Sequence, residues 1–253
     1  MNDLFWLSEP LLARIKPHFS LAHGIPRVDN LQVVSGIILV IRYVNLPRNS
    51  VAYKWKAIMR SWMLREALFW RLHDLMTQSY SLYQQEHMFG ARILLRSGFE
   101  TLATLIYLNQ LTQKVLGGKL CFHELGKKTS AFLLGSRNNS EMPKSINIVT
   151  VLEKCDKRYP GLMNLYAFLS ESAHPSYEGL FKGYSKINHS EFETTFSNRW
   201  MELFVEQHLS SKELCMRTFH YEYNDVWSEL IEKLERWIED NDDKLEACKS
   251  GPC

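Results

Sequence analysis

The chain has 253 residues, of which 45% are hydrophobic and 12% aromatic, and this is enough apolar surface for a packed globular core. Its 30 basic and 28 acidic residues leave a net charge of +2. This balance excludes an overall field that would draw the whole protein onto nucleic acid or a membrane, so any nucleic-acid contact needs a local basic patch.

Residues 1–43 are expected to form a small module of two short helices. Ser8 precedes a proline at a typical helix start, and Pro17 ends this first helix. Asp29 or Asn30 caps the second helix, in which apolar residues recur at helical spacing. Two short helices bury little surface alone, so this module needs a further surface to pack against.

A larger helical domain is expected over residues 48–245, after a break at the segment YVNLPRNS. Residues 51–85 predict one long helix or two. Gly90 is expected to kink or separate it from the helix that covers 88–110, and this next helix should end near Gly117. The Trp and Met residues between positions 55 and 76 indicate core or a homodimer interface.

The helix over 88–110 is the most informative one in the chain. Its apolar residues share one face: Leu94, Leu95, Gly98, Phe99, Leu102, Leu105 and Ile106. On the opposite face, Arg92, Arg96 and Glu100 form a ridge at i, i+4 and i+8. This ridge is either a solvated, salt-bridged face or one wall of a polar site.

Residues 119–144 are less regular, and the helices expected after them span 145–159, 162–172, 199–209 and 210–240. Ser210 and Glu213 have the spacing of a capping box, which predicts that the last helix starts there. Pro175 predicts a loop after His174, and residues 246–253 are expected to form a flexible tail. Because no alternating strand pattern is found, the sequence predicts an all-α helical bundle with a small N-terminal helical module.

The segment LFWLSEPLLARIKPHFSLAHGIPRVDNLQVVSGIILVIR, residues 4–42, resembles the N-terminal segment of insertion-sequence transposases. The resemblance implies a small helical module that helps engage DNA, ahead of a catalytic domain with three acidic metal ligands. After Arg42 the family pattern does not continue, and nothing downstream predicts strands that carry acidic residues. We therefore expect a truncated or chimeric transposase-like protein that at most binds DNA, such as inverted-repeat ends.

Four residues of this module could contact phosphates as a modest basic patch: Arg14, Lys16, His18 and Arg27. Phosphate contacts of this kind position a protein on DNA without reading its sequence. The alternative is that these four are ordinary solvated residues.

A second resemblance concerns the larger domain. The ridge Arg92, Arg96, Glu100, followed by LSESAHPSYEG at 169–179, is similar to HEPN-like and abortive-infection helical domains. Members that cut RNA use an arginine and a histidine four to six residues apart, a spacing that is absent before His174. A ribonuclease role would need Arg92 or Arg96 to meet His174 across helices, so that arginine binds the phosphate and histidine transfers a proton.

The alternative interpretations involve no catalysis. A histidine at a helix end before a proline is commonly a cap or the partner of a carboxylate, and the domain could be a helical interaction module. Cys121-x-His123 lacks a second pair of ligands, and no GxGxxG, Walker, GxSxG or HExxH motif occurs, so no metal or cofactor is expected.

Two further expectations concern the cellular location. The five cysteines are scattered without CxxC pairs, which favours reduced thiols in a cytoplasmic protein. The longest apolar run, 33–44, contains Arg42 and is shorter than the roughly 20 residues that cross a bilayer. The N-terminus also lacks a signal-peptide pattern, so no membrane partner is expected.

Overall fold

The computed structural model describes residues 51–136, 138 and 141–248. The chain divides into two units, 1–50 and 51–253, and all described residues belong to the second. The predicted N-terminal module therefore lies outside the described residues, and so does its proposed basic patch of Arg14, Lys16, His18 and Arg27.

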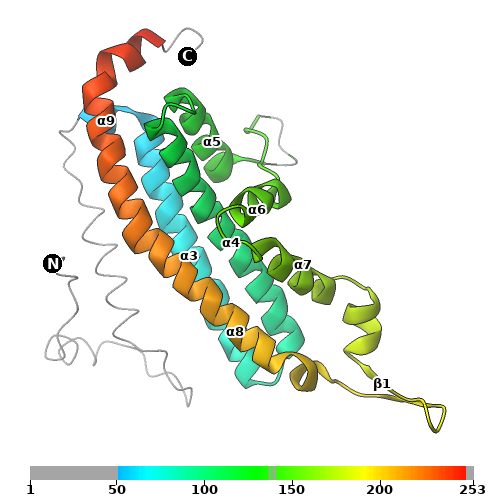
Figure 1. Cartoon of the computed structure of the whole chain (residues 1–253). Helices are drawn as coiled ribbons and strands as arrows, with labels where there is room; N and C mark the ends of the chain where they lie inside the picture. The colour runs from blue at the N-terminus through cyan, green and yellow to red at the C-terminus, as the bar shows by residue number, and fades with distance from the viewer. Residues whose placement is uncertain (1–50, 137, 139–140, 249–253) are drawn as a thin grey trace, which may run out of the picture. The chain divides into compact units, whose positions relative to one another are not determined.

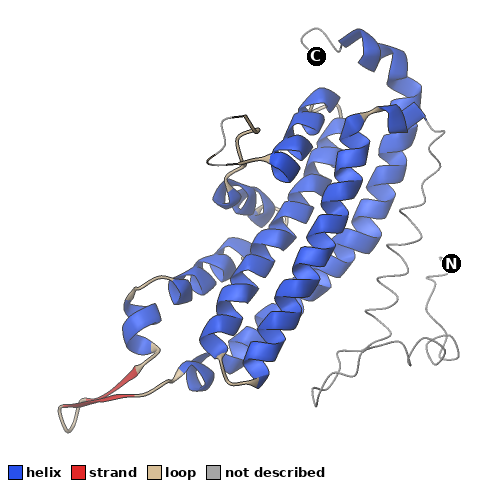
Figure 2. Ribbon diagram, turned by 180° about the vertical axis from the view of Figure 1, so that it is seen from behind, coloured by secondary structure: helices blue, strands red, loops and turns tan. Residues whose placement is uncertain are grey.

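Seven α-helices dominate the described part of the chain (Figures 1 and 2). In chain order they are α3 Lys56–Gln84, α4 Met88–Leu116, α5 Phe122–Leu134, α6 Ile148–Asp156, α7 Leu162–Ala173, α8 Trp200–Tyr221 and α9 Trp227–Ala247. Shorter elements join them: the 3-10 helix η2 Val51–Lys54, the π-helical segments η3 Tyr177–Lys182 and η4 Glu222–Val226, and the strands β1 Ser185–Asn188 and β2 Glu193–Phe196. The predicted all-α helical bundle is confirmed.

Helix α4 is the central helix of this bundle, and it packs against every other α-helix from α3 to α9. From Thr101 to Asn109 all of its residues are buried, so this part is covered around its whole circumference rather than on one face. Gly98 lies where α3 approaches most closely, because a Cβ at this position would be 2.1 Å from the Met76 side chain. A helix enclosed in this way is expected to be apolar all round, and α4 departs from that rule at buried Arg92, Asn109 and three threonines.

The turn between α3 and α4 differs from the prediction. The break falls at Gln85–His87, where Glu86 adopts a left-handed conformation with φ of 61°, and Gly90 lies inside α4. A Cβ on Gly90 would be 3.1 Å from the Leu82 side chain. The glycine therefore serves close helix packing and does not break the helix.

The C-terminal helices α8 and α9 form one continuous rod through η4, and no helix starts at Ser210 as predicted. Ser210 lies inside α8 and its hydroxyl donates to the Gln207 carbonyl, so the predicted capping box does not form. The rod changes register at η4, where the Glu222 carbonyl accepts a hydrogen bond of 3.0 Å from the Asn109 side chain. A side chain of the central helix thus satisfies a backbone group at this π-helical segment.

Three features of the fold are absent from the sequence-based prediction: α5, η3 and a β-hairpin. The region expected to be irregular contains α5, and the expected loop after His174 contains η3 and an antiparallel hairpin. In this hairpin Ser185 pairs with Phe196 and Asn188 pairs with Glu193. The hairpin projects from one end of the bundle (Figure 2), and its strands are too short and too polar to produce a clear alternating pattern.

The aromatic residues of α3 divide between core and surface. Trp62 is buried and stacks edge-on against Trp227 at 4.3 Å, with the guanidinium of buried Arg65 over both rings. By contrast, the side chains of Met63 and Trp70 are exposed. The core prediction is thus correct for only part of the set, and the homodimer stays a prediction.

Two chain-wide expectations can be compared with the described residues. Cys155, Cys215 and Cys248 are free thiols, but Cys121 is disulfide-bonded, so the prediction of reduced thiols is wrong for this residue. Between residues 51 and 248, gaps apart, no helix has both the length and the apolar character that a membrane crossing requires.

Candidate functional site

The ridge of Arg92, Arg96 and Glu100 on α4 faces α7 and is only partly accessible to solvent. Arg92 is fully buried, and the side chains of Arg96 and Glu100 are only 26% and 22% exposed. The ridge is therefore not a fully solvated face, although the expected ion pair between Arg96 and Glu100 forms; its role as one wall of a polar site stays a prediction. We call the contact between this ridge and α7 the polar seam.

Arg96 is the most extensively bonded residue of the polar seam. Its Nε donates to Ser170 Oγ at 2.8 Å and its Nη2 donates to the Tyr166 hydroxyl at 2.6 Å. The same Nη2 lies 3.3 Å from Glu100 Oε1, to which the Tyr166 hydroxyl donates at 3.0 Å. Burial and the adjacent Glu100 carboxylate raise the pKa of Tyr166, so the phenol stays protonated and keeps this donor role.

Arg92 is enclosed among side chains of α7 and α8. Its Nε donates to Ser172 Oγ at 3.0 Å and its Nη1 to Gln207 Oε1 at 3.4 Å. The guanidinium lies 4.9 Å from the Phe168 ring centre and 4.3 Å from that of Phe204. Burial lowers the pKa of Arg92 to about 10, with Glu178 acting in the opposite direction. Arg92 therefore holds helices together, and in this conformation it cannot contact a phosphate from solvent.

His174 lies at the C-terminal end of α7 and is exposed. The helices α4 and α7 are antiparallel here, because Arg92 pairs with Ser172 while Glu100 pairs with Tyr166. His174 is one turn beyond Ser170, to whose carbonyl its N–H donates at 3.1 Å. Along α7, His174 is therefore close to the partner of Arg96 but about 12 Å from the partner of Glu100. Arg92, Arg96 and Glu100 therefore lie along the seam, and His174 lies at the end of α7 beyond the partners of all three.

His208 of α8 is a buried polar residue that the sequence analysis missed. Neither of its ring nitrogens has a hydrogen-bond partner among the described residues, and the ring stacks against Tyr83 at 6.1 Å. Burial, with Arg92 and Lys212 nearby, lowers the pKa of His208 to about 4, so the ring is neutral. Its helical spacing from Trp200 and Phe204 was the available signal.

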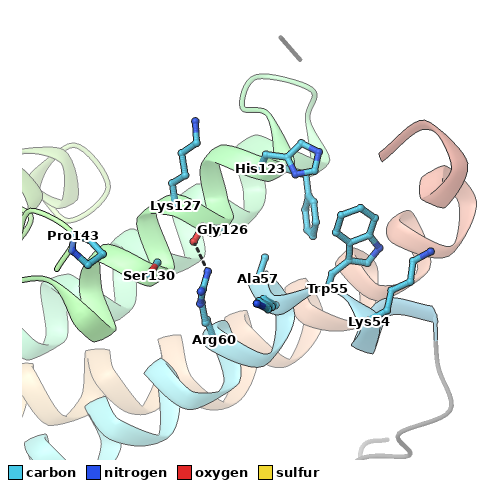
Figure 3. Close-up of a pocket in the computed structure, with 11 residues that line it drawn as sticks. Lys54, Trp55, Ala57, Arg60, His123, Gly126, Lys127, Ser130 and Pro143 are labelled. Carbon is cyan, nitrogen blue, oxygen red and sulfur yellow. Dashed lines mark hydrogen bonds between the residues drawn. The ribbon is translucent and has the colours of Figure 1, made fainter. Parts of the chain in front are cut away.

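A second candidate region lies at the N-terminal end of α3, where α3 and α5 form a pocket of about 500 Å³ (Figure 3). We call it the α3–α5 pocket. Its lining includes four cationic side chains and no aspartate or glutamate: Lys54, Lys56, Arg60 and Lys127. Three rings lie together at one end: Trp55, Phe122 and His123. No sequence pattern predicts this pocket.

The four cations of the α3–α5 pocket differ in how they are neutralised. Lys54 pairs with Asp242 and Glu246, and Lys127 pairs with Glu124. Lys56 and Arg60 have no carboxylate partner among the described residues; Arg60 donates only to the Gly126 carbonyl, at 3.4 Å. Two positive charges in this pocket are therefore available to an anionic ligand.

In the Cys121-x-His123 pair, the His123 ring contacts a backbone carbonyl and an aromatic ring. Its Nε2 lies 3.3 Å from the Leu245 carbonyl oxygen, and its ring lies 5.7 Å from that of Trp55. No group of three or more His, Cys, Asp or Glu residues within the described ranges is arranged to hold a metal ion. The ring is therefore placed as part of an aromatic wall.

Comparison with family models, curated proteins and solved structures found no match to this chain. The resemblances to insertion-sequence transposases and to HEPN-like domains therefore stay predictions.

Proposed function

We propose that this chain is a nucleic-acid-binding helical protein that does not itself catalyse transposition. The observation that carries the proposal is the α3–α5 pocket, where Lys56 and Arg60 lie without carboxylate partners beside aromatic rings. Cations next to aromatic rings are the combination with which proteins hold single strands, since cations attract phosphates and rings stack on bases. The near-neutral net charge agrees with a local site of this kind.

The resemblance of residues 4–42 to insertion-sequence transposases supports DNA as one target. Under this proposal Arg14, Lys16, His18 and Arg27 add phosphate contacts to those of the α3–α5 pocket. The only strands among the described residues are the two of the peripheral hairpin. The proposal therefore does not include an acidic-triad catalytic domain, because such a domain would require a layer of strands.

Fluorescence anisotropy with labelled single-stranded RNA, single-stranded DNA and inverted-repeat duplex tests the proposal. We compare the wild type with the double variant Lys56→Glu/Arg60→Glu and with the control Lys119→Glu, which alters an exposed lysine outside the pocket. The double variant should bind at least tenfold more weakly, and its salt dependence should flatten by about 1.4 in log–log slope. Equal binding by wild type and double variant would refute the role of the pocket.

RNA cleavage at the polar seam is the second candidate function. It is supported by the position of Arg96, which contacts Ser170 one turn before the exposed His174. Arg96 would then bind the scissile phosphate and His174 would transfer the proton, with Glu100 and Tyr166 orienting the arginine.

Cleavage of a labelled RNA by wild type, His174→Ala and the control His189→Ala decides this second candidate. Both histidines are exposed, but His189 lies at the hairpin tip, away from the seam. Loss of cleavage in His174→Ala alone would support it. Equal rates in all three proteins, or no cleavage by the wild type, would leave binding as the only function.

A further inference from the structure

The shape of the α3–α5 pocket limits which part of a nucleic acid it can accept; this step rests on the proposed function. Its volume of about 500 Å³ is that of a small-ligand site. Grooves of a duplex are read by protruding helices or strands, whereas a concave site receives a nucleotide that is splayed out or at a strand end. The pocket therefore fits one nucleotide better than a stretch of helix.

The charges of the pocket limit the kind of phosphate. Lys56 and Arg60 are the two cations without carboxylate partners in the described part, and they come from adjacent turns of α3. An internal phosphodiester carries one negative charge, whereas a phosphomonoester carries about −1.5 to −2 at pH 7. Two unpaired cations thus match a terminal phosphate, and a guanidinium can hold two of its oxygens at once.

Arg60 is held where it can make this contact. Figure 3 shows its side chain directed from α3 toward the Gly126 carbonyl of α5, with Trp55 and His123 on one side and Pro143 on the other. One N–H is used in that 3.4 Å contact, so four of the five guanidinium donors stay available. Two small residues also line the pocket, and a Cβ on Gly126 would lie 3.5 Å from the Cβ of Ala57.

The rings supply the surface for a base. Trp55 and Phe122 are buried and meet edge to face at 5.5 Å, which fixes the wall, while half-buried His123 presents the more accessible ring. Stacking on an aromatic ring is tolerant of base identity because every base has a π face. This wall therefore favours a nucleotide over inorganic phosphate without selecting its sequence.

We infer that the α3–α5 pocket binds a terminal nucleotide, with the phosphomonoester at Lys56 and Arg60 and the base against His123, whose ring is backed by Trp55. The same chemistry is offered by a phosphorylated strand end and by a free mononucleotide.

Competition against a bound, internally labelled single-stranded octanucleotide tests this inference. The competitors are the unlabelled octamer with a 5′-phosphate, with a 3′-phosphate or with two hydroxyl ends, together with adenosine monophosphate, adenosine and inorganic phosphate. The proteins are wild type, Arg60→Ala, Lys56→Ala and His123→Ala, with Lys119→Ala as control. Thermal unfolding by circular dichroism checks that each variant is folded.

A phosphorylated octamer should compete about tenfold better than the hydroxyl-ended one, and Arg60→Ala or Lys56→Ala should abolish this preference. His123→Ala should weaken all nucleotides about tenfold without affecting inorganic phosphate. Adenosine monophosphate that competes as well as the phosphorylated octamer identifies a free nucleotide as the source. Equal competition by phosphorylated and hydroxyl ends, with no effect of the mononucleotide, overturns the inference but leaves the proposed function intact; no octamer binding at all overturns both.

Discussion

The polar seam and the α3–α5 pocket differ in how their positive charges are neutralised. In the seam, Arg96 contacts Glu100 and two hydroxyl groups of α7, and Arg92 is enclosed by protein. In the pocket, Lys56 and Arg60 line an open cavity without carboxylate partners in the described part. Bonded, buried charges fix helices relative to each other, and accessible unpaired ones attract anions. Substitutions in the seam should therefore change stability, and those in the pocket should change binding.

Arg92→Ala is expected to cause the largest loss of stability. It removes the donor to Ser172 and Gln207 and leaves a cavity between the Phe168 and Phe204 rings. We expect the free energy of unfolding to fall by about 4 kcal/mol in urea titrations. Arg92→Met, which refills the space without a charge, should lose clearly less. A loss below about 1 kcal/mol for Arg92→Ala would show that the seam does not hold the helices together.

His208 should give the next largest effect, as a dependence of stability on pH. Its pKa is about 4 in the folded protein and 6.5 without the fold, so the unfolded chain takes up its proton first as the pH falls. The stabilisation from the neutral ring is complete above pH 6.5 and decreases toward pH 4, by about 3 kcal/mol in total. Urea unfolding at several pH values should show this decrease in the wild type and a smaller one in His208→Phe. An equal decrease in the wild type and in His208→Phe would show that His208 does not cause the dependence of stability on pH.

Tyr166→Phe should have a moderate effect. It removes the hydroxyl that accepts from Arg96 and donates to Glu100, which should cost about 1 kcal/mol. Tyr177→Phe is the matched control, because that side chain is 66% exposed. A double-mutant cycle of Tyr166→Phe with Arg96→Met measures the coupling, and strictly additive losses would mean that the hydroxyl does not position the arginine.

Arg60→Ala should have the smallest effect on stability, which would distinguish the pocket from the polar seam. Only one long hydrogen bond to Gly126 is lost, so the free energy of unfolding should change by less than about 0.5 kcal/mol. Affinity for single-stranded nucleic acid should fall about tenfold in the same protein. Destabilisation by more than about 2 kcal/mol would show that the pocket arginine is structural, like those of the seam.

Most of the helical framework could be predicted from the sequence because apolar residues recur at the helical period along α3, α4, α7 and α8. The predicted end of α4 near Gly117 agrees with the structure. The errors at Gly90 and Ser210 have one cause: a glycine or serine can serve packing inside a helix as well as mark its end. Tertiary contacts, such as Leu82 beside Gly90, decide between these uses.

The polar seam could be predicted in part, and the pocket could not. The i, i+4, i+8 spacing placed Arg92, Arg96 and Glu100 on one face, but spacing along one helix does not reveal which helix covers that face. The separation of His174 from Glu100 follows from the antiparallel order of α4 and α7, which only the fold determines. The pocket joins residues 54–60 to residues 122–143, and no local pattern connects these segments.

The projecting hairpin is a suitable site for attaching a label to this molecule. Residues 186–194 are exposed throughout, and Phe192 at the turn is 97% exposed. Exposed tips of this kind accept insertions and chemical tags without disturbing the rest of a domain. A fluorophore attached near His189 would therefore report on molecular tumbling and proximity while leaving both the polar seam and the α3–α5 pocket untouched.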